Sequence, residues 1–171
     1  MAISVEELGV MEPAKARALS FDERDALLDE VLASSRRYVG KQPERQVGLM
    51  CDYIEEDFDL LGKLGVIRIV AGGFIPVDDS GDVPTADPKA QCELVFGNIK
   101  RALAAAGSSL DRITSLVICL RSMTPESWAE MNSVYREYIK CSPARAAIGV
   151  DALNKTYQIE VINLVAWKVA P

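Results

Sequence analysis

An arginine and a glutamate fifteen positions apart are the residues whose types and surroundings indicate chemistry most directly. Arg145 stands in "PARAAIGV" and Glu160 in "IEVINLVAW", two apolar stretches rich in β-branched residues, as buried strands are. A guanidinium keeps its charge in proteins and presents a planar fork that matches a carboxylate. Placing it in an apolar strand without a partner costs several kcal/mol, so the sequence predicts a carboxylate partner for Arg145.

Two partners for Arg145 stay open from the spacing alone. If the turn at residues 151–156 joins two neighbouring strands, Arg145 and Glu160 lie at similar depth and form a structural ion pair. In the functional alternative, Arg145 holds the carboxylate of a substrate. Glu160, made a better proton acceptor by partial burial, then orients a water molecule.

The composition excludes several kinds of active site. The chain has 171 residues, of which 49% are hydrophobic, so it is long enough for one domain with a substantial core. It contains no histidine, which removes the Ser-His-Asp and Cys-His arrangements and the common zinc sites. Its formal net charge is −6, from 25 acidic and 19 basic residues without a basic cluster. We therefore expect neither a metal site nor a nucleic-acid partner.

The sequence also indicates where the protein resides. Glu6 and Glu7 stand where a signal peptide would need cations, and no apolar stretch is long enough to span a membrane. The four cysteines contain no CxxC pair and are expected to be reduced and to pack as small core residues. We therefore expect a soluble cytoplasmic protein without a membrane partner.

The first 46 residues differ in pattern from the rest. Ser20 and Glu23 form a capping-box pattern that begins an amphipathic helix at about residues 21–38. Ser4 and Glu7 repeat the pattern for a shorter helix. We expect residues 1–46 to be a helical extension with a linker, and residues 47–171 to be the main domain.

The main domain alternates strands and helices. Strands are expected at residues 65–74, 113–120, 144–150 and 157–169. Asp87 and Pro88 begin a helix that Gly107 ends, and Thr124 and Pro125 begin a second one. The first helix should bury Leu94, Val95, Ile99, Ala102, Leu103 and Ala106, and the second carries Trp128, Met131, Asn132, Tyr135 and Ile139. This order predicts an α+β domain of two layers, with both helices on one face of the sheet.

Five stretches resemble, in order, the Rid (YjgF) family of imine and enamine deaminases. They are "AGGFIPVD", "NIKRALAAAGSSLDRI", "MNSVYREY", "PARAAIGV" and "IEVINLVAW". The resemblance covers about residues 58–168. The family's Pro-Ala-Arg signature falls on Pro143, Ala144 and Arg145, and its downstream acidic residue falls on Glu160.

The resemblance implies a fold, an assembly and a reaction. The fold is chorismate-mutase-like, with a mixed sheet, and the assembly is a homotrimer with active sites in the clefts between subunits. The reaction converts a 2-imino or 2-enamino acid to the 2-oxo acid and ammonia, without a metal or cofactor. The substrate would be 2-aminoacrylate-like or, if residues 1–46 select a larger one, an amino-dicarboxylate such as an aminomuconate. Arg145 would bind its carboxylate, and Glu160 would position the attacking water.

Further residues correspond to the cleft of the family. Asn132 lines that cleft or caps a loop, and Gly73, with Gly72 before it, allows close backbone approach to a ligand or forms a β-bulge. Three positions depart from the family, and all three are expected to contact the substrate. Ala147 stands where a cysteine is common, Phe74 replaces a glutamine, and Phe58 is nearest to a frequent tyrosine.

Two alternatives to the enzyme stay open, and one is disfavoured. The same cleft could hold a 2-oxo acid without turnover, as a regulatory trimer. Ribonuclease activity, sometimes attributed to such proteins, fits poorly with an acidic chain that lacks histidine and a basic cluster. The helical extension would cover a sheet edge, clasp a neighbouring subunit, or close over the cleft and select a larger substrate.

Overall fold

The computed structural model describes residues 3–39 and 59–171 and divides the chain into two compact units. One unit comprises Met1–Arg68 with Trp167–Pro171, and the other comprises Ile69–Ala166. Within the described ranges, no helix is long and apolar enough to cross a membrane. The boundary predicted at residues 46 and 47, and the linker before it, lie outside the described residues.

The first unit contains the N-terminal helices. They are α1 (Val5–Val10), α2 (Pro13–Arg17) and α3 (Phe21–Val39), and residues 59–64 are also helical. The capping box predicted at Ser20 is present, since the Glu23 amide donates to Ser20 Oγ at 3.3 Å and the Ser20 amide donates to the Glu23 carboxylate at 2.9 Å. The expected helix over residues 21–38 is therefore confirmed, because its first turn is fixed by local hydrogen bonds.

Basic side chains tie these helices to the rest of their unit. The Arg24 guanidinium donates to the carbonyl oxygens of Leu64 and Ala170, each at 3.2 Å. Lys63 Nζ donates to the carbonyl oxygen of Leu8 at 3.4 Å. The buried apolar side chains of this unit include Leu8, Leu27, Leu28, Val31, Leu32, Leu61 and Leu64. The extension thus contacts residues 59–64 and the C-terminal segment that belongs to the same unit.

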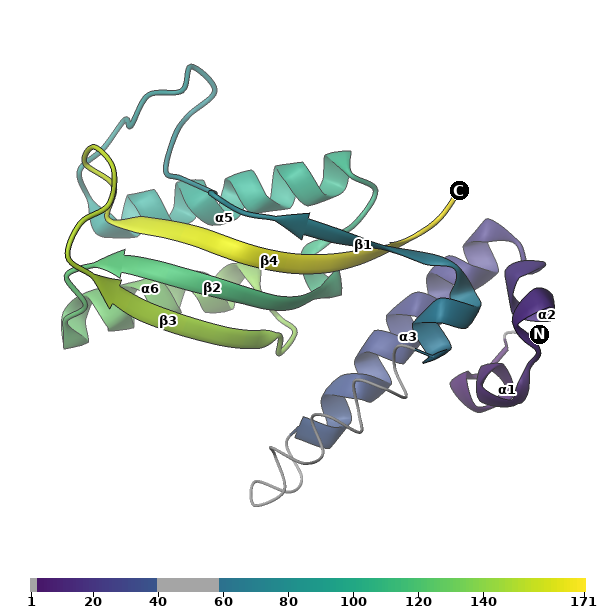
Figure 1. The fold of residues 1–171 in the computed structure, drawn as a ribbon. Helices are drawn as coiled ribbons and strands as arrows, with labels where there is room; N and C mark the ends of the chain where they lie inside the picture. Colours follow the sequence, from purple (N-terminus) through teal and green to yellow (C-terminus); the bar gives the residue numbers. More distant parts are fainter. Residues whose placement is uncertain (1–2, 40–58) are drawn as a thin grey trace. The chain divides into compact units, whose positions relative to one another are not determined.

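A mixed four-stranded sheet forms the second layer of the main domain (Figure 1). Its strands are β1 (Val66–Ala71), β2 (Ile113–Arg121), β3 (Ala144–Val150) and β4 (Ile159–Val169). Their order across the sheet is β1-β4-β2-β3, with β2 parallel to β3 and antiparallel to β4. Because β2 separates β3 from β4, the prediction that these two strands are neighbours is wrong.

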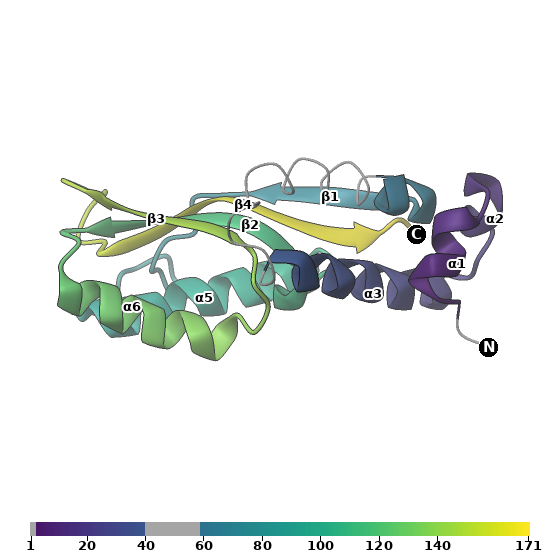
Figure 2. The ribbon, with the colours of Figure 1, turned by 90° about the horizontal axis from the view of Figure 1, so that it is seen from below.

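Both long helices of the domain lie on one face of the sheet (Figure 2). They are α5 (Pro88–Ala105) and α6 (Pro125–Tyr138), and a short 3-10 turn, η2 (Leu110–Arg112), precedes β2. Asp87 caps α5 by accepting from the Ala90 amide at 2.8 Å, and Thr124 caps α6. The predicted α+β fold of two layers, with two helices on one face of a mixed sheet, is confirmed.

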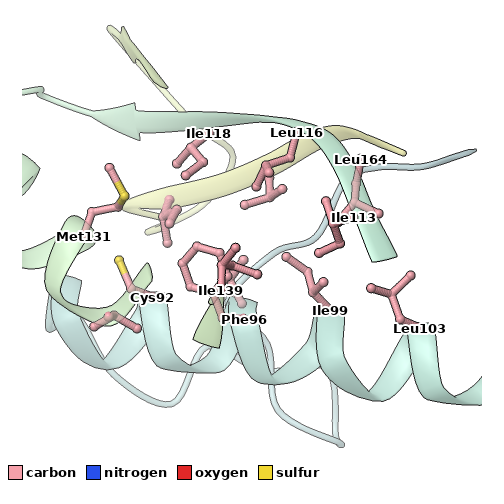
Figure 3. Packing of buried hydrophobic residues seen from close by; sticks show 14 of the residues in the cluster. Cys92, Phe96, Ile99, Leu103, Ile113, Leu116, Ile118, Met131, Ile139 and Leu164 are labelled. Carbon is pink, nitrogen blue, oxygen red and sulfur yellow. The ribbon is translucent and has the colours of Figure 1, made fainter. Parts of the chain in front are cut away.

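The core lies between the sheet and the helices (Figure 3). One face of α5 supplies Cys92, Phe96, Ile99 and Leu103, which pack against sheet residues that include Ile113, Leu116, Ile118 and Leu164. The predicted stripe on this helix was partly wrong, because Ala102 is exposed while Cys92 and Phe96 are buried. Burial of these large side chains is the main stabilising term of such a layer.

Strand β3 is less buried than its composition suggested. It forms one edge of the sheet, and Ala146, Ile148 and Gly149 are exposed, with Ile148 45% accessible. The prediction of a buried strand at residues 144–150 is therefore wrong for the single chain. Small and β-branched residues do not distinguish a central strand from an edge strand whose face is left uncovered.

Candidate active site

Arg145 faces the helical layer. In the parallel pairing of β2 with β3, Arg145 is the partner of Leu116, whose side chain is 1% exposed in the core. Partners in neighbouring strands share a face of the sheet, so the guanidinium points toward the helices. Its half-buried position places a permanent positive charge between an edge strand and α6.

Three residues of α6 contact the Arg145 guanidinium. Arg145 Nη1 donates to Asn132 Oδ1 at 2.9 Å. The guanidinium carbon lies 4.3 Å from the ring centroid of Tyr135 and 5.5 Å from that of Trp128. The positions 128, 132 and 135 are four and three residues apart, which places them on one helical face. We call these four residues the guanidinium half-site.

The sequence did not reveal the contacts of Trp128 and Tyr135 with the arginine. Their spacing with Asn132 was a usable signal, since it predicts a shared face. Nothing in that spacing, however, indicates that the face packs against β3.

Asn132 orients the arginine from a buried position. Its side chain is 9% exposed, and its Nδ2 donates to the carbonyl oxygen of Trp128 at 2.8 Å. This hydrogen bond leaves Oδ1 directed at Arg145. Asn132 therefore positions the guanidinium, and its predicted contact with a substrate stays a prediction.

Part of the guanidinium fork makes no hydrogen bond within the described part of the chain. Nη1 is held by Asn132, whereas Nε and Nη2 have no hydrogen-bond or ion-pair partner among residues 3–39 and 59–171. An ion pair at the surface joins Arg101 to Asp79 instead. The structural ion pair between Arg145 and Glu160 is thus not formed in the described chain.

Glu160 faces the opposite side of the sheet. Its neighbours Ile159 and Val161 are fully buried in the core, and successive residues of a strand point to opposite faces. Its partner on β2 is Cys119, and a side chain built on Gly73 would lie 3.9 Å from Glu160 Oε1. We call Glu160, Cys119 and Gly73 the carboxylate half-site.

One chain does not bring the two half-sites together. Arg145 and Glu160 lie on strands separated by β2, and their side chains point to opposite faces of the sheet. The expectation of similar positions on two adjacent strands failed because the loop at residues 151–158 runs past the end of β2, where the Arg121 side chain donates to the carbonyl oxygens of Leu153 and Lys155. A site that uses both residues therefore requires a second copy of the chain.

The two glycines have different structural roles. A side chain at Gly72 would approach the Asn163 amide nitrogen to 3.2 Å, beside an irregularity in β4 where Asn163 has a φ of 49°. Gly73 has a φ of 72°, which glycine adopts without strain. Close packing against β4 accounts for Gly72, while Gly73 turns the chain next to Glu160.

The other predicted substrate contacts lie apart from the carboxylate. Phe74 exchanges backbone hydrogen bonds with Val161, at 2.9 and 3.0 Å, and packs against the core. Ala147 also packs against the core, on the same face as Arg145. Phe58 lies outside the described residues. A role of these three residues in substrate binding stays a prediction.

The two half-sites differ in their electrostatics. Burial raises the pKa of the Tyr135 phenol, and the Arg145 charge offsets part of that rise. Burial, followed by the negative charge of Glu160, raises the pKa of the Cys119 thiol. Both groups are therefore neutral near neutral pH. Among the described residues, no three His, Cys, Asp or Glu side chains are grouped to hold a metal.

We predict that the buried thiols are unreactive in the native protein. Burial raises the pKa of Cys92 to about 12, and that of Cys119 is also raised. A variant with Cys51→Ser and Cys141→Ser should therefore take up almost no iodoacetamide at about pH 8, because only the thiolate reacts. The same variant unfolded in urea should be alkylated at both positions, measured by mass spectrometry. Rapid labelling of the native variant would contradict the assigned environments.

Known proteins resemble this chain in both sequence and structure. A family model described as Endoribonuclease L-PSP matches residues 65–167. The chain is 39% identical over 108 residues to the RutC family protein PH0854 of Pyrococcus horikoshii, covering 62% of this chain and 82% of that protein. It is 33% identical over 101 residues to 3-aminoacrylate deaminase RutC of Acinetobacter baylyi, covering 56% and 76%.

A solved structure agrees with these matches. The Rid family protein YyfA of Yersinia pestis, itself described as of unknown function, superposes with a TM-score of 0.53 at 30% identity, covering 60% of this chain and 79% of that one. The chain therefore belongs to the Rid (YjgF) family, whose model is the one described as Endoribonuclease L-PSP.

Proposed function

We propose that the protein is a cofactor-free hydrolytic deaminase of 2-imino or 2-enamino acids. The observation that carries the proposal is the Arg145 guanidinium, oriented by Asn132 with Nε and Nη2 unbonded in the described chain. Two parallel N–H groups of this kind bind a carboxylate in a bidentate manner. The substrate class is a small carboxylate, 2-aminoacrylate-like or an amino-dicarboxylate such as an aminomuconate.

The reaction needs little beyond positioning and one proton acceptor. Arg145 fixes the substrate carboxylate, which places the electrophilic iminium carbon. Glu160 accepts a proton as water forms a bond to that carbon, giving a carbinolamine. Glu160 then passes this proton to the nitrogen and accepts the hydroxyl proton as the C–N bond breaks, which releases ammonia and the 2-oxo acid. Water supplies the oxygen, and no electrons are transferred.

The proposed assembly is a homotrimer in which each site joins half-sites of two copies. Arg145 would come from the edge strand of one subunit and Glu160 from the sheet of the next. The exposed Ile148 and Ala146 of β3 support this arrangement, because a face with such residues is suited to burial against another copy. The mass of the protein in solution should therefore be three times that of the chain.

A regulatory trimer that binds a 2-oxo acid without turnover is the alternative. Arg145 would suffice for it, whereas the half-buried Glu160 would then have no task. The relative RutC, named as a 3-aminoacrylate deaminase, supports the enzyme.

Turnover of an imine made in the assay tests the proposal. An amino-acid oxidase with catalase converts an amino acid to its 2-imino acid, which semicarbazide traps. The protein should lower the yield of semicarbazone in proportion to its concentration and speed formation of the 2-oxo acid. Pyruvate binding without any effect on imine lifetime would favour the regulatory trimer instead. RNA cleavage abolished by Arg145→Ala would contradict both.

A further inference from the structure

We infer that Trp128 selects, for the proposed site, carboxylate ligands that carry a flat aromatic or conjugated side chain. The inference rests on the proposed function in treating Arg145 as the carboxylate anchor. Trp128 lies beside that anchor, yet its side chain is 39% exposed. A partly exposed indole is a surface on which a ligand can stack, and here it lies next to a guanidinium whose Nε and Nη2 have no partner in the described part of the chain.

The distances allow a bound ligand to reach the indole. In a bidentate pair, the carboxylate carbon lies about 4 Å from the guanidinium carbon. The Trp128 ring centroid lies 5.5 Å from that same guanidinium carbon. The side chain of a 2-imino acid begins two bonds beyond the carboxylate carbon, so it can lie over the indole.

The anchor and the indole are held together by the same helix. The Trp128 carbonyl accepts from Asn132, which in turn accepts from Arg145. The orientation of the carboxylate is thus coupled to the backbone of Trp128. A rigid platform of this kind favours planar groups that stack without losing many rotamers.

The guanidinium half-site offers few hydrogen-bonding groups to a polar side chain of a ligand. Both the amide and the oxygen of Asn132 are already used, and Tyr135 packs under the guanidinium. A flat apolar group therefore has a partner in the indole, whereas a short side chain such as that of the alanine-derived imine would leave it uncovered.

The test compares kcat/KM for the imines of phenylalanine and alanine. Trp128→Ala should lower the value for the phenylalanine imine about tenfold or more and change that for the alanine imine by less than about twofold. Trp128→Phe should keep most of the preference. Met123→Ala is the matched control, since Met123 is also 39% exposed and lies beside Gly149 of β3. It should leave both values unchanged.

Two results would overturn the inference. One is an equal decrease of kcat/KM for both imines in Trp128→Ala, and the other is dissociation of the oligomer by the same substitution. Either result would mean that Trp128 has a structural role and does not select the substrate. If the wild type turned over neither imine, the proposed deaminase function would be refuted. The role of Trp128 would then be tested by ligand binding alone. Calorimetry with phenylpyruvate and pyruvate should then show that Trp128→Ala weakens only phenylpyruvate, and unchanged affinity for phenylpyruvate would refute it.

Discussion

Replacing Arg145 by alanine is expected to lower kcat/KM for any 2-imino acid by roughly two orders of magnitude or more, equivalent to about 3 kcal/mol. The change removes the bidentate anchor of the carboxylate, and it also leaves Asn132 Oδ1 without its donor. Calorimetry with pyruvate should show a matching loss of affinity, because the same anchor holds the product. Thermal unfolding of the variant checks that the fold is retained.

Two control variants show whether the geometry and the position of the Arg145 guanidinium matter beyond its positive charge. Arg145→Lys keeps a positive charge but cannot present two parallel N–H groups, so it should recover only a small part of the activity. Arg101→Ala removes an exposed arginine whose partner is Asp79, and it should leave activity unchanged. Full activity of Arg145→Ala would contradict the assignment of the anchor.

Replacing Glu160 by glutamine is expected to lower kcat by about 10²- to 10⁴-fold, because the amide cannot accept the proton of the attacking water. The change is nearly isosteric and lies on the face of the sheet away from the core. Pyruvate should therefore bind almost as tightly as to the wild type. The single-turnover rate of imine loss measures the chemical step without product release.

The control for Glu160 is a carboxylate of the same type elsewhere. Glu130→Gln, at an exposed position of α6, should keep full activity. If Glu160→Gln also kept it, solvent rather than this residue would activate the water, and the role of Glu160 would be lost.

The helices and strands could be predicted from the sequence because their signals are local. Three helices are capped by contacts between residues no more than four positions apart, at Ser20 with Glu23, at Asp87 with Pro88, and at Thr124. Gly107, with a φ of 76°, ends α5 as expected, since the Ser108 amide donates to the Leu103 carbonyl oxygen at 2.8 Å. Local hydrogen bonds of this kind are decided by neighbours in the chain.

The arrangement of the strands could not be predicted in the same way. The turn between β3 and β4 is short enough for a hairpin, yet β2 pairs with both strands. The burial of β3 was overestimated for the same reason, since the position of a strand in the sheet depends on contacts distant in sequence. The structural ion-pair alternative depended on this error, because it placed Arg145 and Glu160 on neighbouring strands of one chain.

The identity of the site residues was easier to infer than their partners. Arg145 was predicted to need a partner because of its charge, and the structure gives it Asn132 and two aromatic rings. The position of the carboxylate half-site depends on sheet order and on the alternation of β4. The sequence alone defines neither the sheet order nor the face on which Glu160 lies, because both depend on the register of strand pairing.

Mixing two inactive variants tests the central claim most directly. Arg145→Ala and Glu160→Gln chains, carrying different tags, are produced together, and oligomers that contain both tags are purified. In a trimeric ring that contains both chains, one interface of the three, about one third of the total, pairs an intact Arg145 with an intact Glu160. The purified mixed trimers should therefore recover about one third of wild-type kcat per site.

Each variant produced alone, carrying both tags, should stay inactive. If the mixture is no more active than the separate variants, although both tags are present in one oligomer, the two residues do not meet across subunits. That result would contradict a deaminase site built from the guanidinium of one chain and the carboxylate of another.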